Sequence, residues 1–155
     1  MKKMDIKRVL FVCTGNSCRS IMAEAYMKKR SKEDGLNLDI ESAGTLGIEG
    51  LEPTKEARKV LEIEGVDTGG CRSRVLTDAL VKWADIILVM EPVHKLKVLE
   101  MAPDAANKIH FLGEFNPEQG DILIPDPIGR PLAFYRATFR IIRQSIEELI
   151  RCLKK

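Results

Sequence analysis

The chain has 155 residues, of which 45% are hydrophobic and 31% are charged, as is typical of a soluble globular domain. Its 25 basic and 23 acidic side chains leave a net charge of +2, which gives no reason to expect nucleic acid or a membrane surface as a partner. No apolar run approaches the roughly 18 residues of a membrane span, and the N-terminus lacks the apolar segment of a signal peptide. We therefore expect one domain over residues 1–155, located in the cytoplasm.

Short apolar runs alternate with helical patterns along the chain. In chain order, the patterns predict a strand at 8–13, a helix at 20–35, a strand at 38–44, helices at 53–65 and 76–84, a strand at 85–90, a helix at 91–103, a strand at 108–112 and a helix at 131–155. Ser20 and Thr77 are the expected N-caps of their helices. The predicted apolar stripe of the last helix consists of Leu132, Tyr135, Phe139, Ile142, Ile146, Leu149 and Leu153. This alternation predicts an α/β domain with a parallel sheet, in which ligands bind beyond the carboxyl ends of the strands.

The sequence CTGNSCRS, residues 13–20, follows the first predicted strand and leads into a helix. The N–H groups at a helix N-terminus have no intrahelical partners and attract anions. Gly15 permits backbone geometry that other residues resist, and the Arg19 guanidinium can bind two phosphate oxygens at once. The same surroundings favour the thiolate form of Cys13. The loop therefore combines an oxyanion site with a nucleophile that can attack phosphorus.

A phosphoryl transfer to Cys13 also needs a proton donor for the leaving group. The longest irregular stretch of the chain covers residues 113–131, and long loops of this kind are often functional. Asp126 lies within it, between two prolines that stiffen the backbone. We expect Asp126 to be the general acid.

Other interpretations of the loop fit the residues less well. A structural zinc ion takes four grouped ligands, whereas Cys13 and Cys18 are only two, and the two histidines of the chain fall in separate elements. Four residues separate these cysteines, whereas a thioredoxin-type redox pair is separated by two. An inert turn would have no need of Arg19 beside Cys13. We expect no metal and no cofactor.

The stretch VLFVCTGNSCRSIMAEA, residues 9–25, resembles the signature of the low-molecular-weight protein tyrosine phosphatase family. Further blocks agree in order, namely SAGT at 42–45, SRVL at 73–76, ADIILVME at 84–91 and PDPIGRPLAFY at 125–135. The resemblance implies a three-layer α/β/α fold around a central four-stranded parallel sheet. It also implies a phosphatase whose partners are phosphorylated proteins and whose loop binds phosphate or other oxyanions. We expect a monomer or a weak dimer.

Carried over position by position, the resemblance assigns the catalytic roles to three residues. Cys13 would be the nucleophile that forms a phosphocysteine. Arg19 would bind the phosphate and stabilise the transition state. Asp126 would protonate the leaving group and then act as base toward the hydrolytic water.

The resemblance also assigns supporting roles around the loop. The phosphate-binding loop would comprise Thr14, Gly15, Asn16, Ser17, Cys18 and Ser20. Asn16 and Ser42 would hold its shape through hydrogen bonds, and Ser20 would interact with the Cys13 thiolate. Cys18 would be able to form a reversible disulfide with Cys13 and so shield it from further oxidation.

The chain departs from the family pattern at two positions. Ile21 stands where the family has proline, and Cys71 stands where many members have a histidine that supports the loop. We expect Cys71 to be a small buried apolar residue and Cys152 to serve packing. His94 is expected on a helix surface and His110 in a strand.

The loop does not by itself identify the substrate. Ser17 and the Ile128-Gly129 pair resemble the bacterial protein arginine phosphatases more closely than the tyrosine phosphatases, so both phosphoarginine and phosphotyrosine stay open. Thioredoxin-coupled arsenate reductases share the loop CTGNSCRS, but they need two further cysteines and residues 91–130 contain none. A catalytically silent domain that binds anions or senses redox state is the alternative that is not an enzyme.

Overall fold

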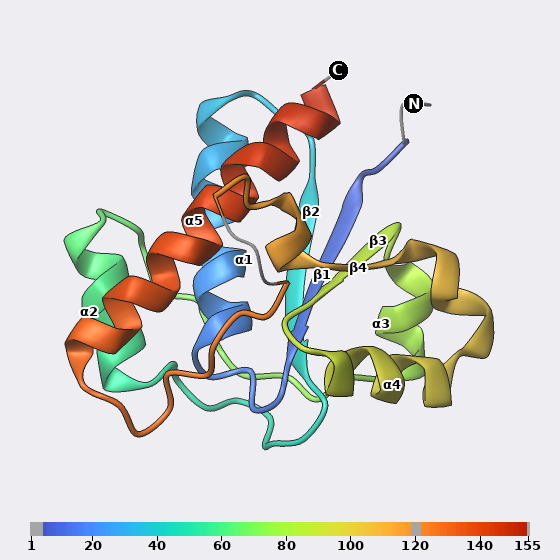
Figure 1. Ribbon diagram of the computed structural model, residues 1–155, viewed down its shortest axis with the longest axis horizontal. Helices are drawn as coiled ribbons and strands as arrows, with labels where there is room; N and C mark the ends of the chain where they lie inside the picture. Colours follow the sequence, from blue (N-terminus) through green and yellow to red (C-terminus); the bar gives the residue numbers. More distant parts are fainter. Residues whose placement is uncertain (1–4, 119–121, 155) are drawn as a thin grey trace.

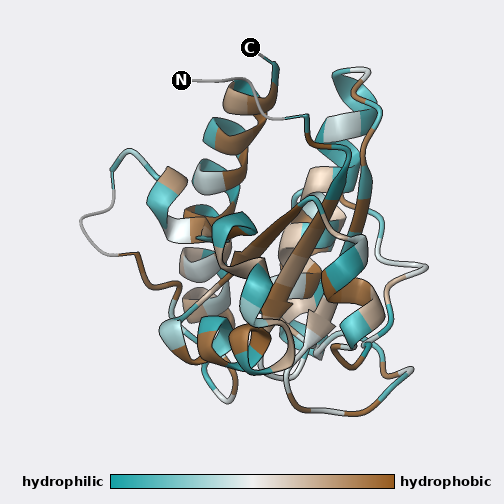
Figure 2. Cartoon of the chain, turned by 90° about the vertical axis from the view of Figure 1, so that its right-hand side faces the viewer, coloured by the Kyte–Doolittle hydropathy of each residue, from teal (hydrophilic) through white to brown (hydrophobic). Residues whose placement is uncertain are grey.

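In the computed structural model, which describes residues 5–118 and 122–154, parallel strands form the centre of the protein (Figure 1). In the order β2-β1-β3-β4, the four strands of this sheet are β2 (Asp39–Gly44), β1 (Arg8–Cys13), β3 (Ile86–Val89) and β4 (Ile109–Phe111). All residues of β1 after Arg8 are buried, as expected for an inner strand that is covered on both faces. The sheet forms a mainly hydrophobic band in Figure 2.

Helices cover both faces of the sheet and confirm the predicted three-layer α/β/α fold (Figure 1). The helices on one face are α1 (Arg19–Glu33), α2 (Lys55–Ile63) and α5 (Leu132–Lys154). Those on the other face are α3 (Asp78–Trp83) and α4 (Pro92–Met101), and the short 3-10 helices η1 (Pro103–Lys108) and η2 (Leu112–Phe115) flank β4. Because side chains alternate along a strand, Val9 and Phe11 of β1 enter the first core, whereas Leu10 and Val12 enter the second.

The predicted elements are present, with most ends shifted by one or two residues. Thr77 caps α3 as predicted, with its side chain accepting a hydrogen bond from the N–H of Leu80. The predicted cap of α1 is wrong, because the helix begins at Arg19 and Ser20 lies in its first turn. The stretch 113–131 also differs from the prediction, since its first residues belong to η2; residues 119–121, within it, and residue 155 lie outside the described part of the chain.

Helix α5 packs its predicted apolar stripe against the sheet. Five members of the stripe are buried, and Leu132 and Leu153 at its two ends are partly buried. Within residues 5–118 and 122–154, no helix is both long enough and apolar enough to span a bilayer.

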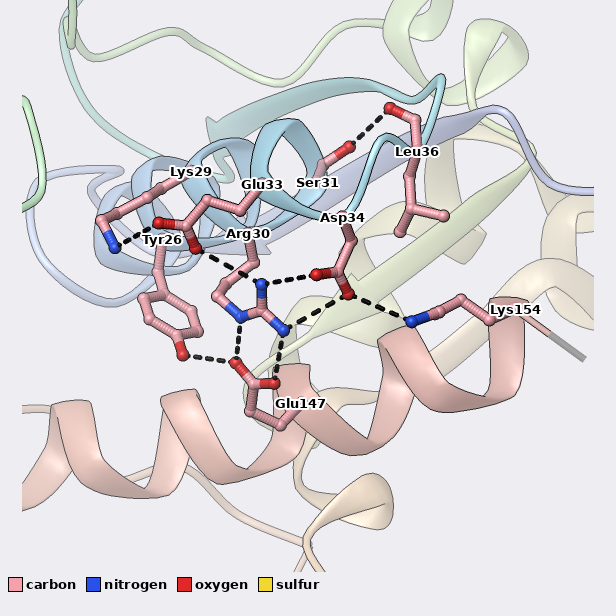
Figure 3. A network of polar contacts seen from close by, with 9 residues as sticks. All are labelled: Tyr26, Lys29, Arg30, Ser31, Glu33, Asp34, Leu36, Glu147 and Lys154. Atoms are coloured by element: carbon pink, nitrogen blue, oxygen red, sulfur yellow. Dashed lines mark hydrogen bonds and ion pairs between the residues drawn. The ribbon is translucent and has the colours of Figure 1, made fainter.

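A polar network joins α5 to the C-terminal half of α1 (Figure 3). Arg30 donates from Nε to a Glu147 carboxylate oxygen at 2.7 Å and from Nη2 to the other oxygen at 3.1 Å. The Tyr26 hydroxyl donates to the same carboxylate. Burial, followed by this contact with a carboxylate, raises the pKa of Tyr26, whereas the hydrogen bonds from Arg30 lower the pKa of Glu147. The two helices are thus fixed side by side by charge as well as by apolar packing.

Gly44, the last residue of β2, lies unusually close to the loop that follows β1. A Cβ atom at this position would lie 2.5 Å from the Thr14 carbonyl oxygen and 2.7 Å from that of Leu46. Both are backbone atoms, held in part by the hydrogen bond from the Leu46 N–H to the Thr14 carbonyl at 2.9 Å. The loop can adopt its observed path only because residue 44 has no side chain.

We predict that Gly44→Ala destabilises the protein by about 1–3 kcal/mol, the usual cost of overpacking, and distorts the loop after β1. Chemical denaturation measures the first effect, and the affinity for inorganic phosphate measures the second. Gly70→Ala is the matched control, because a Cβ there would meet no atom within 4 Å. Equal stability of the two variants would contradict the close approach.

Candidate active site

The loop of residues 13–19 connects the carboxyl end of β1 to the N-terminus of α1. The inner position of β1 and the adjacent helix start place this loop at the edge of the sheet where ligands of α/β proteins bind. The Cys13 side chain is buried at the beginning of the loop, and Arg19 at its end is only 2% exposed. A buried thiol and a buried guanidinium thus lie at the two ends of one short loop.

Ser20 contacts the Cys13 sulfur from the first turn of α1. Its Oγ lies 2.9 Å from Cys13 Sγ and accepts a hydrogen bond from Asn16 Nδ2 at 2.7 Å. Because Asn16 occupies an acceptor site of this oxygen, the Ser20 hydroxyl proton is free to point at the sulfur. The geometry therefore provides a hydrogen-bond donor to Cys13 in its anionic form.

Asn16 holds the loop in shape. It is fully buried and has a positive φ of 54°, in the left-handed region that asparagine tolerates better than most residues. Besides Ser20, its Nδ2 donates to Ser42 Oγ at 2.9 Å, and its Oδ1 accepts from the N–H of Arg74 at 2.8 Å. The Ser42 hydroxyl donates in turn to Glu24. The structure thus brings Asn16, Ser20 and Ser42 together around the loop, as the sequence predicts.

Arg19 brings the predicted acid into the site. Its Nη1 donates to a Glu91 carboxylate oxygen at 2.7 Å and to the Ile124 carbonyl at 2.8 Å. Its Nη2 lies 3.7 Å from Asp126 Oδ2. The Asp126 carboxylate is exposed, and its Oδ1 accepts the N–H of Ile128 at 3.1 Å, which orients the side chain. Asp126, distant in sequence, therefore lies beside the loop that carries Cys13.

Cys18, the residue of the loop before Arg19, directs its sulfur toward α5. Its sulfur is 3.6 Å from the Tyr135 hydroxyl and 3.6 Å from Ser17 Oγ, and burial raises its pKa. Burial also raises the pKa of Tyr135, to about 12, and the Tyr135 hydroxyl accepts a hydrogen bond from Thr54 Oγ1 at 3.3 Å. Cys13 and Cys18 are both free thiols. A disulfide between them stays a prediction.

Both positions that depart from the family pattern, Ile21 and Cys71, are buried. Cys71 is buried, as predicted, and burial raises the pKa of its thiol. Cys152 is partly exposed on α5, and His110 lies in β4 as predicted.

Among residues 5–118 and 122–154, no three His, Cys, Asp or Glu side chains are grouped in a way that could hold a metal ion.

The prediction for His94 is wrong, because this residue is fully buried instead of lying on a helix surface. Its Nδ1 accepts the N–H of Glu91 at 3.1 Å, so the ring proton lies on Nε2 and is donated to Thr14 Oγ1 at 2.9 Å. Burial, followed by the positive charge of Arg19, lowers the pKa of His94 to about 4. Glu91 and His94 were both missed by sequence reasoning; the signal available was their spacing around Pro92, since two residues separate the N-cap from N3 in a capping box.

The fold and the loop define a class of cysteine-dependent enzymes that bind an oxyanion between a strand and a helix N-terminus. The chain belongs to the family described as low molecular weight phosphotyrosine protein phosphatase, whose family model matches residues 8–155. The protein-arginine-phosphatase of Geobacillus stearothermophilus is 37% identical over 144 residues, which cover 92% of this chain and 90% of that protein.

Solved structures agree with this assignment. A low molecular weight protein tyrosine phosphatase from T. tengcongensis is 39% identical, with a TM-score of 0.86 and coverage of 94% of this chain and 98% of that one. A mutant of the YwlE arginine phosphatase that carries a phosphorylated active-site serine is 30% identical, with a TM-score of 0.88 and coverage of 96% of both chains. The chain is therefore similar to both arginine and tyrosine phosphatases.

We predict that the stability of the protein falls as the pH is lowered from about 6.5 toward 4, because the unfolded chain takes up a proton on His94 before the folded protein does. The pKa of His94 falls from 6.5, the ordinary value of an exposed histidine, to about 4 in the folded protein. The neutral form is thus favoured by the fold, and the stabilisation is present above pH 6.5. Its size is about 3 kcal/mol, because each pKa unit is worth about 1.4 kcal/mol.

Denaturation of the wild type and of His94→Gln across this pH range measures the effect. Carboxylates with lowered pKa values, such as Glu147, contribute to the pH dependence of stability in both proteins. The difference between the two pH profiles therefore gives the contribution of His94 alone. Parallel pH profiles for the two proteins would contradict the prediction.

Proposed function

We propose that the protein hydrolyses phosphorylated side chains of proteins through a phosphocysteine on Cys13. The observation that carries the proposal is the convergence of three groups: the buried Cys13 thiol, the Arg19 guanidinium, and the Asp126 carboxylate 3.7 Å from that guanidinium. Membership of the phosphatase family supports it. The Ser20 hydroxyl, 2.9 Å from the sulfur, adds the hydrogen-bond donor that a thiolate nucleophile needs.

In the first step, the substrate phosphoryl group binds to the backbone N–H groups of residues 14–19 and to Arg19. The Cys13 sulfur attacks phosphorus, the bond to the leaving atom breaks, and Asp126 in its protonated form donates a proton to that atom. Arg19 stabilises the charge that spreads over the phosphoryl oxygens in the transition state. The leaving group departs as a neutral phenol from phosphotyrosine, or as a guanidinium cation from phosphoarginine.

In the second step, the Asp126 carboxylate removes a proton from water, and the water oxygen attacks the phosphorus of the phosphocysteine. The bond between phosphorus and sulfur breaks, and the thiolate accepts a hydrogen bond from the Ser20 hydroxyl while it leaves. Phosphate is released, and Cys13 and Asp126 return to their starting states. In this scheme Cys13 is the nucleophile, Arg19 stabilises the phosphoryl charge, and Asp126 acts first as acid and then as base.

For the substrate, we propose phosphoarginine ahead of phosphotyrosine. Ser17 supplies a small hydroxyl within the phosphate-binding loop, which suits a polar guanidinium better than an aliphatic side chain would. Asp126 is followed by Pro127, Ile128 and Gly129, so the acid loop offers no aromatic ring there to stack on a phenyl group. The named arginine phosphatase relative supports this order. The T. tengcongensis structure keeps phosphotyrosine as the second candidate.

The alternatives are less well supported. Arsenate reduction through a thioredoxin-coupled relay needs further cysteines near the loop, but the remaining two are Cys71, buried, and Cys152, on α5. A catalytically silent domain would have no need for Cys13, Arg19 and Asp126 together. We further propose that the chain acts as one domain in the cytoplasm, as a monomer or weak dimer and without a metal or cofactor.

We predict that Asp126→Ala lowers kcat for phenyl phosphate by about 10²–10⁴-fold, the usual contribution of general acid–base catalysis. The loss of phosphorylation rate should be smaller for p-nitrophenyl phosphate, because its leaving group needs less protonation. Pre-steady-state bursts or a leaving-group series measure the difference.

Asp104→Ala, at an exposed position of η1, is the matched control and should keep wild-type rates. Cys13→Ser should abolish turnover of both esters, and its retention of activity would remove Cys13 as nucleophile. Equal losses for good and poor leaving groups in Asp126→Ala would remove Asp126 as the acid.

We predict that Ser17→Ile shifts the ratio of kcat/KM for phosphoarginine and phosphotyrosine peptides toward phosphotyrosine by about tenfold or more. An aliphatic side chain offers no hydrogen bond to a guanidinium, and the loss of one such bond is worth about 1.4 kcal/mol, or a factor of ten. Ser17→Thr keeps the hydroxyl and serves as the control. An unchanged ratio in Ser17→Ile would show that residue 17 does not select the substrate.

A further inference from the structure

The first turn of α4 contacts both ends of the phosphate-binding loop. The pairing of β1 with β3 places Val12 opposite Val89, so the chain that leaves β3 runs beside the loop that leaves β1. Glu91, at the N-cap of α4, binds Arg19, and His94, three residues later, binds Thr14. Thr14 and Arg19 are the first and last residues of the loop after Cys13. The N-terminus of α4 therefore contacts the phosphate-binding loop at both of its ends.

We propose that His94 is a positioning residue, which fixes the beginning of the phosphate-binding loop by donating its Nε2–H to the Thr14 hydroxyl oxygen. This inference rests on the proposed phosphatase function, because it concerns how the loop holds the phosphate. It gives a role to a fully buried imidazole that the two catalytic steps do not use.

Both ring nitrogens of His94 are engaged, which fixes the plane of the ring. Nδ1 accepts the Glu91 N–H at 3.1 Å, and Nε2 donates to Thr14 Oγ1 at 2.9 Å. Since Glu91 itself holds Arg19 Nη1 at 2.7 Å, the ring, the N-cap and the guanidinium form one connected set. A shift of the His94 ring would move Thr14 directly and would release the N-cap that carries the partner of Arg19.

The charges around His94 favour a positional role over an acid–base role. Burial is the main effect that lowers the pKa of the ring, and Arg19 from α1 adds to it, whereas Glu91 at the N-cap of α4 and Asp126 from the loop before α5 raise the pKa. The ring is therefore neutral near pH 7. A neutral ring adds no cation to the anion site, and it does not change its protonation state between pH 5 and 8. Loss of His94 should therefore lower the rate without moving the limbs of the pH–rate profile between pH 5 and 8.

Two substitutions separate loop positioning from helix capping. His94→Asn places an amide near the position of Nδ1, where it can still accept the Glu91 N–H, but it is too short to reach Thr14. His94→Gln places an amide near the position of Nε2, where it can donate to Thr14. His110→Gln, at the second histidine of the chain, in β4, is the matched control.

The test measures kcat/KM for p-nitrophenyl phosphate from pH 5 to 8, the dissociation constant of inorganic phosphate, and stability for all variants. We expect His94→Asn to lose about tenfold in kcat/KM and in phosphate affinity, as for one hydrogen bond. His94→Gln should recover most of this loss, and His110→Gln should match the wild type. In a Thr14→Val background, His94→Asn should have little further effect, because the partner hydroxyl is already absent.

Wild-type phosphate affinity and kcat/KM in His94→Asn would overturn the proposal. So would equal losses in His94→Asn and His94→Gln that follow stability, because a general packing role predicts them. A moved pH limb in His94→Asn would make His94 an acid–base group instead. If the wild type turns over no phosphate ester, the proposed function fails, but the phosphate affinities of the same variants still decide the role of His94.

Discussion

The buried amide of Asn16 holds the candidate site together. Both of its donor positions and its acceptor are used, toward Ser20 and Ser42 and from the N–H of Arg74. These partners come from α1, from β2 and from the segment before α3, so the amide ties three distant parts of the chain to one loop. A buried amide that loses one partner incurs the cost of an unsatisfied polar group, so such a network is stable only when complete. The three hydrogen bonds of the Asn16 side chain together stabilise its left-handed backbone conformation.

The layers of the fold could be predicted from the sequence because hydrophobic periodicity is a local property. The apolar run of β1 and the stripe of α5 indicate elements that need no knowledge of their neighbours. The start of α1 could not be predicted in the same way. Ser20 has the side chain of a good N-cap, but its hydroxyl is engaged by Cys13 and Asn16 instead of by the helix. A tertiary contact therefore overrides the local preference.

In the candidate site, too, some residues could be predicted from local sequence patterns and others depend on tertiary contacts. Cys13 and Arg19 belong to a continuous strand–loop–helix segment, and Asp126 is marked by the prolines beside it. His94 reaches the loop only through the pairing of β1 with β3, which no local pattern reveals. Hydropathy is even misleading in α4, where Val93 and Leu96 are exposed while the histidine between them is fully buried. Predicting this contact would have required the strand order first.

The hydrogen bonds that Arg19 makes within the protein have a thermodynamic consequence for the arrival of an anion. A free arginine side chain loses about 2 kcal/mol of rotamer entropy when it is fixed in one geometry. Here the guanidinium is already immobilised by the Glu91 carboxylate at 2.7 Å and the Ile124 carbonyl at 2.8 Å. That ordering is completed when the chain folds, so a phosphoryl group meets a rigid receptor, and its binding is not weakened by the need to arrest a mobile cation.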